Sequence, residues 1–259
     1  MRNFLILRKK IQKVSLFEGN FVHLYMKYTL PQFSDFLKDV RLDLYRQKYV
    51  SIKIVEMDLP EEIQALKTIY EQYWENKDNL KEPPTFDEYY KVYLKDTDGK
   101  RQKFRDKSGF DNNCSCFDRG LEARIYRTWA SLITQIHAGY VAETVFGKGS
   151  IQMSPELDHK GIDFLVKKNE IQLKIQVKKS SHRLESRIER KLEKDIHIIN
   201  YFVPSASDFG NPYYRVGENK GKIKQQLLTF VEFDPKNGVL QRYDNGFIVF
   251  TQKVFESFL

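Results

Sequence analysis

A two-stranded β-hairpin is indicated by the sequence Ile162-Asp-Phe-Leu-Val-Lys-Lys-Asn-Glu-Ile-Gln-Leu-Lys-Ile-Gln-Val-Lys178. From Ile171 onward, apolar and polar side chains alternate without exception, which is typical of a strand with one buried face. The run Ile162–Val166 predicts the preceding strand, and the polar residues 167–170 predict the turn between the two.

Helices and a further strand are predicted around this hairpin. Apolar residues recur at three- and four-residue steps from Asp118 to Phe146, which predicts a long helix. After the hairpin, the pattern predicts an amphipathic helix over 184–194 and a strand over 198–203. The chain therefore has the pattern of an α/β fold with a mixed sheet.

The chain divides into three parts by composition. Residues 1–30 are an N-terminal appendage, residues 31–113 are mainly helical, and residues 114–259 contain the hairpin and form the core. Thr85-x-x-Glu88 resembles a capping box inside the helical part. The polar residues 95–113 predict a loop or linker.

Composition excludes several classes of protein. With 259 residues, of which 41% are hydrophobic, the chain is long enough to bury a sizeable core. No stretch approaches the roughly 18 apolar residues that cross a bilayer, and no signal-peptide core is evident. Cys114 and Cys116 lack the further ligands of a zinc site. A reducing bacterial or archaeal cytoplasm is the expected location.

Positive charge is concentrated around the hairpin. The net formal charge is +8, and the segment from Lys160 to Lys194 contains eleven Lys and Arg against five Asp and Glu. Such a stripe favours a polyanionic partner, most simply the phosphates of nucleic acid. We expect Lys160, Lys179, Arg183, Arg187 and Lys191 to contact DNA. Alternatively, the helix over 184–194 only covers the sheet, with its basic face in water.

Four residues of the core suggest a catalytic site. Asp163 lies in the first strand, Gln176 and Lys178 share one face of the second strand, and Glu143 ends the long helix. In this order of elements they resemble the PD-(D/E)xK nuclease core, in which an acid and an acid-x-Lys pair hold a divalent metal beside a phosphate. The resemblance makes Asp163, Gln176, Glu143 and the Val177 carbonyl metal ligands, and Lys178 the residue that positions or deprotonates water.

These residue types suit phosphodiester hydrolysis. A hard cation such as Mg²⁺, held by oxygen ligands, stabilises charge on phosphorus and activates water. Gln176 departs from the commoner acid, so Asp158 or Glu143 would have to supply the missing negative charge. A short Asp…Gln-x-Lys match is by itself more often a coincidence of ordinary sheets than a catalytic site.

Four separated stretches also resemble the TaqI-type restriction endonucleases, roughly over residues 35–180. They are Tyr45-Arg-Gln-Lys-Tyr49, Val55-Glu-Met-Asp-Leu-Pro60, Gly120-Leu-Glu-Ala-Arg-Ile-Tyr-Arg-Thr128 and Leu157-Asp-His-Lys-Gly-Ile-Asp-Phe-Leu165. The resemblance implies that Asp158 and Asp163 are both essential. It further implies a Mg²⁺-dependent enzyme that cuts duplex DNA at the palindrome T-C-G-A, acts as a homodimer and accompanies a cognate DNA methyltransferase.

Two other functions are compatible with the same residues. A structure-specific nuclease of the resolvase or repair type uses the same core and would prefer branched DNA. A catalytically silent DNA-binding protein would keep the core without activity, which the presence of Gln176 allows.

Overall fold

The computed structural model describes residues 28–55, 57–108, 115–179, 195–201, 213–219, 222–227 and 238–259. Its helices and mixed sheet confirm the predicted α/β class. The predicted basic helix over 184–194 lies outside the described residues, as do residues 1–27 of the predicted appendage. None of the helices in the described ranges is long and apolar enough to span a membrane.

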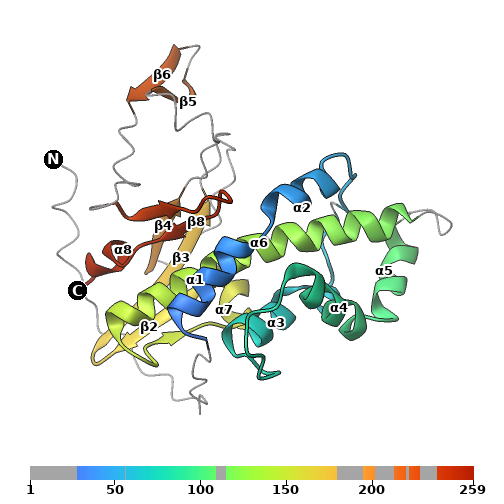
Figure 1. Ribbon diagram of the computed structural model, residues 1–259, viewed down its shortest axis with the longest axis horizontal. Helices are drawn as coiled ribbons and strands as arrows, with labels where there is room; N and C mark the ends of the chain where they lie inside the picture. The colour runs from blue at the N-terminus through green and yellow to red at the C-terminus, as the bar shows by residue number, and fades with distance from the viewer. Residues whose placement is uncertain are drawn as a thin grey trace.

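The central element is α6 (Cys116–Phe146), a helix of 31 residues that crosses the molecule from one side to the other in Figure 1. The apolar repeat predicted this helix to within two residues of its start. Trp129, Ile133 and Ile136 are fully buried along it because other elements pack on several of its sides. Cys116 is disulfide-bonded, which differs from the free thiols expected in a reducing cytoplasm.

A mixed four-stranded sheet packs against the C-terminal part of α6. Its strands are β1 (Ile151–Gln152), β2 (Phe164–Lys168), β3 (Ile171–Lys179) and β4 (Ile196–Tyr201). β2 and β3 form the predicted antiparallel hairpin, and β4 runs parallel to β3. The turn needs only Asn169 and Glu170, and Asn169 adopts a φ of 52° there.

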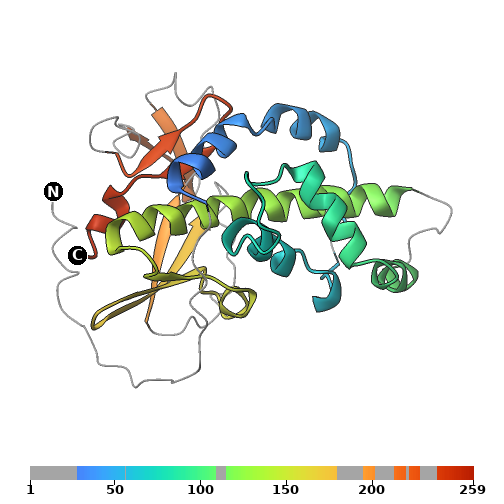
Figure 2. The same cartoon turned by 60° about the horizontal axis from the view of Figure 1, so that its bottom comes forward.

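Short helices cover α6 along much of its length (Figure 2). They are α1 (Leu30–Asp39), α2 (Leu42–Tyr49), the 3₁₀ turn η1 (Glu61–Ile63), α3 (Leu66–Ile69), the π-helical turn η2 (Tyr70–Trp74) and α4 (Phe86–Asp96). The capping box at the start of α4 is confirmed, because the Thr85 Oγ1 accepts from the Glu88 backbone and the Glu88 carboxylate accepts from the Thr85 backbone.

The predicted loop over 95–113 is wrong in part, because residues Lys100–Ser108 form the helix α5. Its residues are mostly good helix formers, and a single apolar side chain, Phe104, anchors it. Phe104 is buried with its ring 6.0 Å from that of Phe117 at the start of α6. A single buried residue among nine produces no periodic pattern of apolar side chains, so the sequence predicted a polar loop here.

The C-terminal segment returns to α6 and the sheet. β7 (Leu240–Arg242) and β8 (Ile248–Phe250) form a hairpin, and β8 packs on α6, while β5 (Tyr213–Asn219) and β6 (Lys222–Leu227) form another. The final helix α8 (Lys253–Glu256) places Phe255 against Phe164 of β2, with ring centroids 6.0 Å apart. The strand β8 confirms the last predicted strand, over 247–250.

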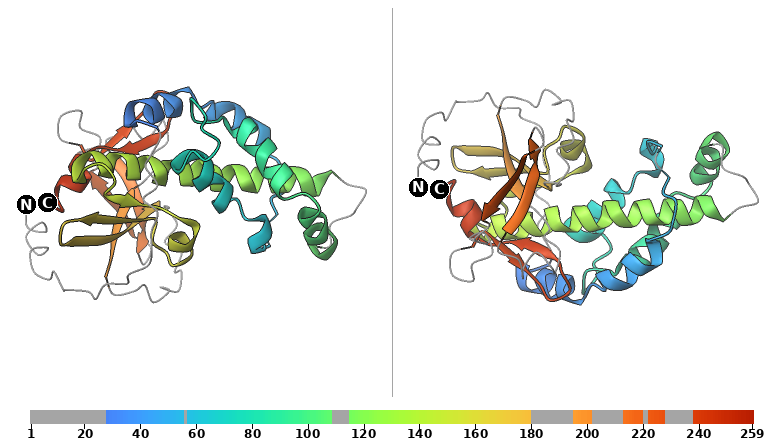
Figure 3. Two further views of the ribbon diagram at one scale, coloured as in Figure 1. Left: turned by 90° about the horizontal axis from the view of Figure 1, so that it is seen from below. Right: turned by 90° about the horizontal axis from the view of Figure 1, so that it is seen from above.

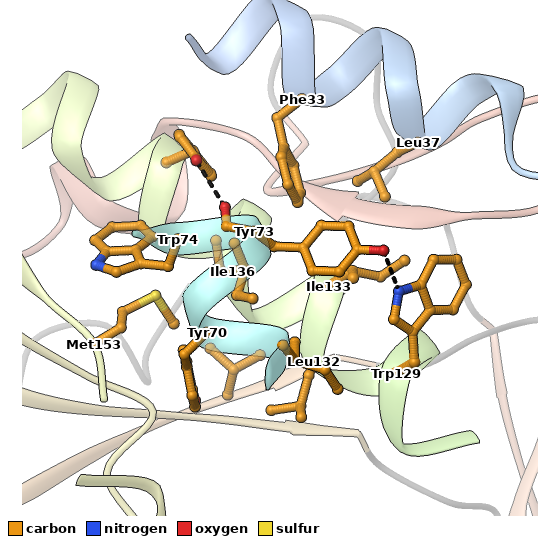
Figure 4. Packing of buried hydrophobic residues seen from close by; sticks show 14 of the residues in the cluster. Phe33, Leu37, Tyr70, Tyr73, Trp74, Trp129, Leu132, Ile133, Ile136 and Met153 are labelled. Atoms are coloured by element: carbon orange, nitrogen blue, oxygen red, sulfur yellow. Dashed lines mark hydrogen bonds between the residues drawn. The ribbon is translucent and has the colours of Figure 1, made fainter. Parts of the chain in front are cut away.

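The core is rich in aromatic side chains. Figure 4 shows Tyr73 between Phe33 of α1 and Trp129 of α6, and the Trp129 Nε1 donates to the Tyr73 hydroxyl at 2.8 Å. In Figure 3 the sheet lies at one end of α6 and α5 at the other, so one helix carries both the helical layer and the sheet.

Candidate active site

Asp163 lies immediately before β2 rather than inside a strand. Its side chain is 4% exposed, and its Oδ2 accepts a hydrogen bond of 2.5 Å from the backbone N–H of Val177 in β3. Its own backbone N–H donates to the Ile175 carbonyl at 2.9 Å. These bonds fix the carboxylate against the segment of β3 that carries Gln176 and Lys178.

Asp158 reaches the same place from the short helix α7 (Pro155–His159), which the sequence did not predict. Ser154 caps α7, and the Gly161 backbone N–H donates to the Asp158 carbonyl at 2.8 Å. Gly161 has a φ of 76°, a conformation that glycine adopts without strain, and it reverses the chain toward Asp163. A tight turn therefore brings together two aspartates that are five residues apart in the sequence.

The two carboxylates influence one another electrostatically. Burial and, to a smaller extent, the charge of Asp158 raise the pKa of Asp163 to about 7, although the hydrogen bond from Val177 lowers it. Burial likewise raises the pKa of Asp158. The charge of Asp163 also raises the pKa values of Tyr70 and Tyr201, after the larger effect of their burial. Two desolvated carboxylates side by side are unfavourable unless a proton or a cation compensates them.

Gln176 and Lys178 flank Val177 on β3, as the alternation predicted. Ile175 and Val177 are buried on one face, whereas Gln176 is partly exposed and Lys178 exposed on the other. Beside Gln176, Ile198 of β4 is 39% exposed, so this face of the sheet is open.

Glu143 is not grouped with the two aspartates. It is partly buried near the end of α6, and its Oε1 accepts from the Gly149 backbone N–H at 2.7 Å, which stabilises the turn after the helix. Burial raises its pKa, and the Gly149 hydrogen bond and the charge of Lys148 oppose this shift. Within the described ranges, no three His, Cys, Asp or Glu side chains are close enough to hold a metal ion together.

The donors present nevertheless fit Mg²⁺. Mg²⁺ prefers oxygen ligands, is commonly held by only one or two protein carboxylates, and keeps several waters. Asp158 and Asp163 supply two such carboxylates, and burial raises the pKa of both. The Gln176 amide and the Val177 carbonyl are further oxygen donors on the adjacent strand.

A cluster of cations lies beside this end of β3. The guanidinium of Arg46 on α2 lowers the pKa of Lys179, after the larger effect of burial. Arg46 and Arg242 each place a guanidinium nitrogen within 4.0 Å of the position that a Cβ on Gly246 would take. We call Arg46, Lys179 and Arg242 the basic cluster. Lys160, also predicted to contact DNA, is exposed at the C-cap of α7.

Arg46 and Tyr70 were missed as site residues by the sequence analysis. Arg46 belongs to the stretch Tyr45-Arg-Gln-Lys-Tyr49, whose family resemblance was the available signal. Nothing in the pattern around Tyr70 pointed to the aspartates, because 88 residues separate it from Asp158.

A cavity of about 370 Å³ lies elsewhere, between α1, α2, α4 and α6. It is lined by Phe36, Tyr45 and Trp129 among others, and none of the predicted catalytic residues borders it. The predicted catalytic residues Asp163, Gln176 and Lys178 lie instead just before β2 and on β3.

Comparison with known proteins identifies the family of the chain. The sequence pattern of the TaqI restriction endonuclease family matches residues 30–258, beyond the 35–180 range in which motifs were apparent. The type II restriction enzyme TthHB8I of Thermus thermophilus is 30% identical over 234 residues, which cover 89% of this chain and 88% of that enzyme. The type II restriction enzyme TaqI of Thermus aquaticus is 31% identical over 234 residues, which cover 88% of this chain and 86% of that enzyme.

No solved structure is significantly similar to the chain. Family membership therefore rests on sequence, and the paired aspartates lie within the matched range. The chain belongs to the TaqI restriction endonuclease family and is a type II restriction enzyme, that is, a site-specific deoxyribonuclease.

Proposed function

We propose that this enzyme hydrolyses phosphodiester bonds of duplex DNA in a Mg²⁺-dependent reaction at a short palindrome, with T-C-G-A as the first candidate. The observation that supports this most directly is the buried pair Asp158 and Asp163, adjacent to Gln176 and Lys178 at one end of β3. The target sequence is proposed from the family resemblance and from relatedness to TaqI.

We assign each proposed site residue a separate role in the hydrolysis. Asp158 and Asp163 would hold Mg²⁺, with the Gln176 amide and the Val177 carbonyl as further ligands and Glu143 as a more distant candidate. When bound, Mg²⁺ stabilises negative charge on the phosphate and promotes ionisation of water. Lys178 positions the attacking water and offsets the charge that develops on the phosphate. This assignment corresponds to a PD-(D/E)xK core over 114–259, joined to a helical region over 31–113.

DNA would approach the open end of the sheet. The basic cluster and Lys160 would contact backbone phosphates. Arg183, Arg187 and Lys191 stay proposed contacts outside the described residues. Because a palindrome has two-fold symmetry, we propose a homodimer that offers one active site to each strand. A methyltransferase of the same specificity would protect the host DNA in the cytoplasm.

A digest of unmethylated plasmid tests the proposal. We expect discrete fragments with Mg²⁺ and none with chelator, and sequencing of the fragment ends gives the site and the stagger. Cleavage of branched DNA in preference to linear duplex would instead favour the structure-specific alternative. Binding without cleavage in any divalent metal would favour the catalytically silent one.

Substitution of the proposed catalytic residues tests their roles. Asp163→Ala and Lys178→Ala should each reduce cleavage by about three orders of magnitude or more while the protein stays folded. Asp158→Ala should be severely impaired as well. Asp39→Ala, at an exposed position on α1, is the matched control and should cleave normally. Near wild-type turnover of Asp163→Ala would contradict the assignment.

A further inference from the structure

Tyr70 connects the helical layer to the active site. It is the first residue of the π-helical turn η2 and is fully buried, and its hydroxyl lies 3.5 Å from the Asp158 Oδ1. In Figure 4 its ring extends from η2 in the direction opposite to Phe33 of α1. The hydroxyl thus points out of the aromatic core toward the aspartates.

This contact differs from those of three other fully buried tyrosines. The hydroxyls of Tyr73, Tyr93 and Tyr140 donate to backbone carbonyls, which is the usual way to satisfy a buried phenol. Within the described part of the chain, the Tyr70 hydroxyl donates to Asp158, and Asp158 receives no other side-chain hydrogen bond. Among the described residues, each of these two side chains therefore has the other as its one side-chain hydrogen-bond partner.

Asp158 needs an external support to keep one orientation. It lies on a five-residue helix, and so short a helix is not stable without tertiary contacts. Tyr70, in contrast, has a rigid ring that the core holds in place. The π-helical turn, closed by the bond from the Glu75 N–H to the Tyr70 carbonyl at 2.9 Å, sets where this ring points. Such turns occur often at functional sites.

We propose that Tyr70 is a positioning residue, which holds Asp158 by one carboxylate oxygen and leaves the other free for the metal ion. The inference rests on the proposed function of the aspartate pair. Carboxylates that ligate metals are commonly held by a second hydrogen bond, and loss of that bond typically weakens metal affinity or activity by about 10- to 100-fold.

The substitution Tyr70→Phe removes only the hydroxyl and preserves the packing of the ring. We expect the Mg²⁺ concentration for half-maximal cleavage to rise about tenfold. Affinity for duplex DNA, measured with chelator and no divalent metal, should stay within about twofold of wild type, because Tyr70 is fully buried. Binding of Mn²⁺ to the protein without DNA, followed by the EPR signal of the free ion, should weaken by a similar factor.

Tyr73→Phe is the matched control. Tyr73 is in the same turn and equally buried, but its hydroxyl bonds to Trp129 and to the Pro84 carbonyl and not to the aspartates. This variant should melt at a lower temperature and keep wild-type Mn²⁺ affinity. If Tyr70→Phe shows the same pattern, its hydroxyl has only a structural role and the inference is overturned.

A double variant tests whether Tyr70 acts through Asp158. Combined with Asp158→Asn, Tyr70→Phe should weaken Mn²⁺ binding no further than Asp158→Asn does alone, since coupled residues are not additive. Fully additive losses would overturn the inference. Absence of DNA cleavage by the wild type would contradict the proposed function, whereas the Mn²⁺ comparison would still decide the role of Tyr70.

Discussion

At the scale of single residues, Asp163 is proposed to be catalytic, and its ionised carboxylate destabilises the folded protein. Its carboxylate is buried beside Asp158, and its pKa of about 7 means that it is ionised at pH 8 in an environment that disfavours charge. The Val177 N–H offsets part of this cost.

Asp163→Asn should therefore make the metal-free protein more stable while it abolishes cleavage. Asparagine keeps an oxygen acceptor for Val177 and carries no charge, so we expect a gain of about 1 to 3 kcal/mol at pH 8. Urea unfolding in the presence of chelator measures this gain. Asp39→Asn, at an exposed position, should change stability little. A destabilised Asp163→Asn would show that the carboxylate is not strained in the free protein.

His137 should make stability depend on pH. Its ring is buried in α6 with Nε2 3.1 Å from the Ser34 Oγ, and burial lowers its pKa to about 3. Below pH 6.5 the unfolded chain binds a proton that the folded protein does not, so stability is lost as the pH falls from 6.5 toward 3. The slope contributed by this residue reaches about 1.4 kcal/mol per pH unit.

Urea unfolding of wild type and His137→Gln at several pH values tests this slope. The difference in stability between the two proteins should shift in favour of the variant as the pH falls below 6.5. Parallel curves for wild type and His137→Gln would mean that His137 becomes protonated in the folded protein.

At the scale of elements, the sequence predicted those helices and strands that depend on a local pattern of residues. The alternation over 171–178 predicted β3, the apolar repeat predicted α6, and Thr85 and Glu88 predicted the start of α4. Each of these depends on neighbours within a few residues. The helix α5 was missed because one aromatic residue, Phe104, anchors it through a tertiary contact.

The candidate site was predictable only in part for the same reason. Gln176 and Lys178 follow from strand alternation, and the pairing of Asp158 with Asp163 came from the resemblance to a family. The turn at Gly161 that joins the two aspartates leaves no periodic signal. Tyr70 and Arg46 reach the site from helices more than a hundred residues before β3, and only tertiary packing brings them there.

Gly120 tests how closely α6 packs. A Cβ at this position would lie 2.6 Å from the Lys53 carbonyl oxygen and 3.3 Å from a methyl group of Val55. Alanine normally stabilises a helix interior by up to about 1 kcal/mol relative to glycine, but the clash with backbone should dominate. We expect Gly120→Ala to lose about 1 to 3 kcal/mol in thermal unfolding.

Ser131→Ala, exposed on the same helix, is the control for this experiment and should be neutral or slightly stabilising. If Gly120→Ala is as stable as Ser131→Ala, the segment around Lys53 yields to the added methyl group. The contact between that segment and α6 would then be loose.

At the scale of the whole molecule, the basic cluster should govern how salt affects DNA binding. Each phosphate contact that is lost makes the log–log dependence of affinity on salt shallower by about 0.9. Arg46→Ala and Lys179→Ala should each produce a change of this size, measured with Ca²⁺ in place of Mg²⁺. Lys38→Ala is the control, because Lys38 already pairs with Asp35 at 2.7 Å. Unchanged slopes would place the DNA on another face.

The length of α6 has a consequence for the dimensions of the DNA complex. With 31 residues at about 1.5 Å each, the helix is about 46 Å long, which exceeds the roughly 34 Å of one turn of duplex. The sheet packs near one end, and α5 is anchored at the other through Phe104 and Phe117. The aspartates, however, lie beside the middle of α6, because Tyr201, whose pKa the charge of Asp163 raises, hydrogen-bonds Thr134 there. A duplex cut at the aspartates that also reached α5 would therefore run beside about half of the helix, which is less than one turn of duplex.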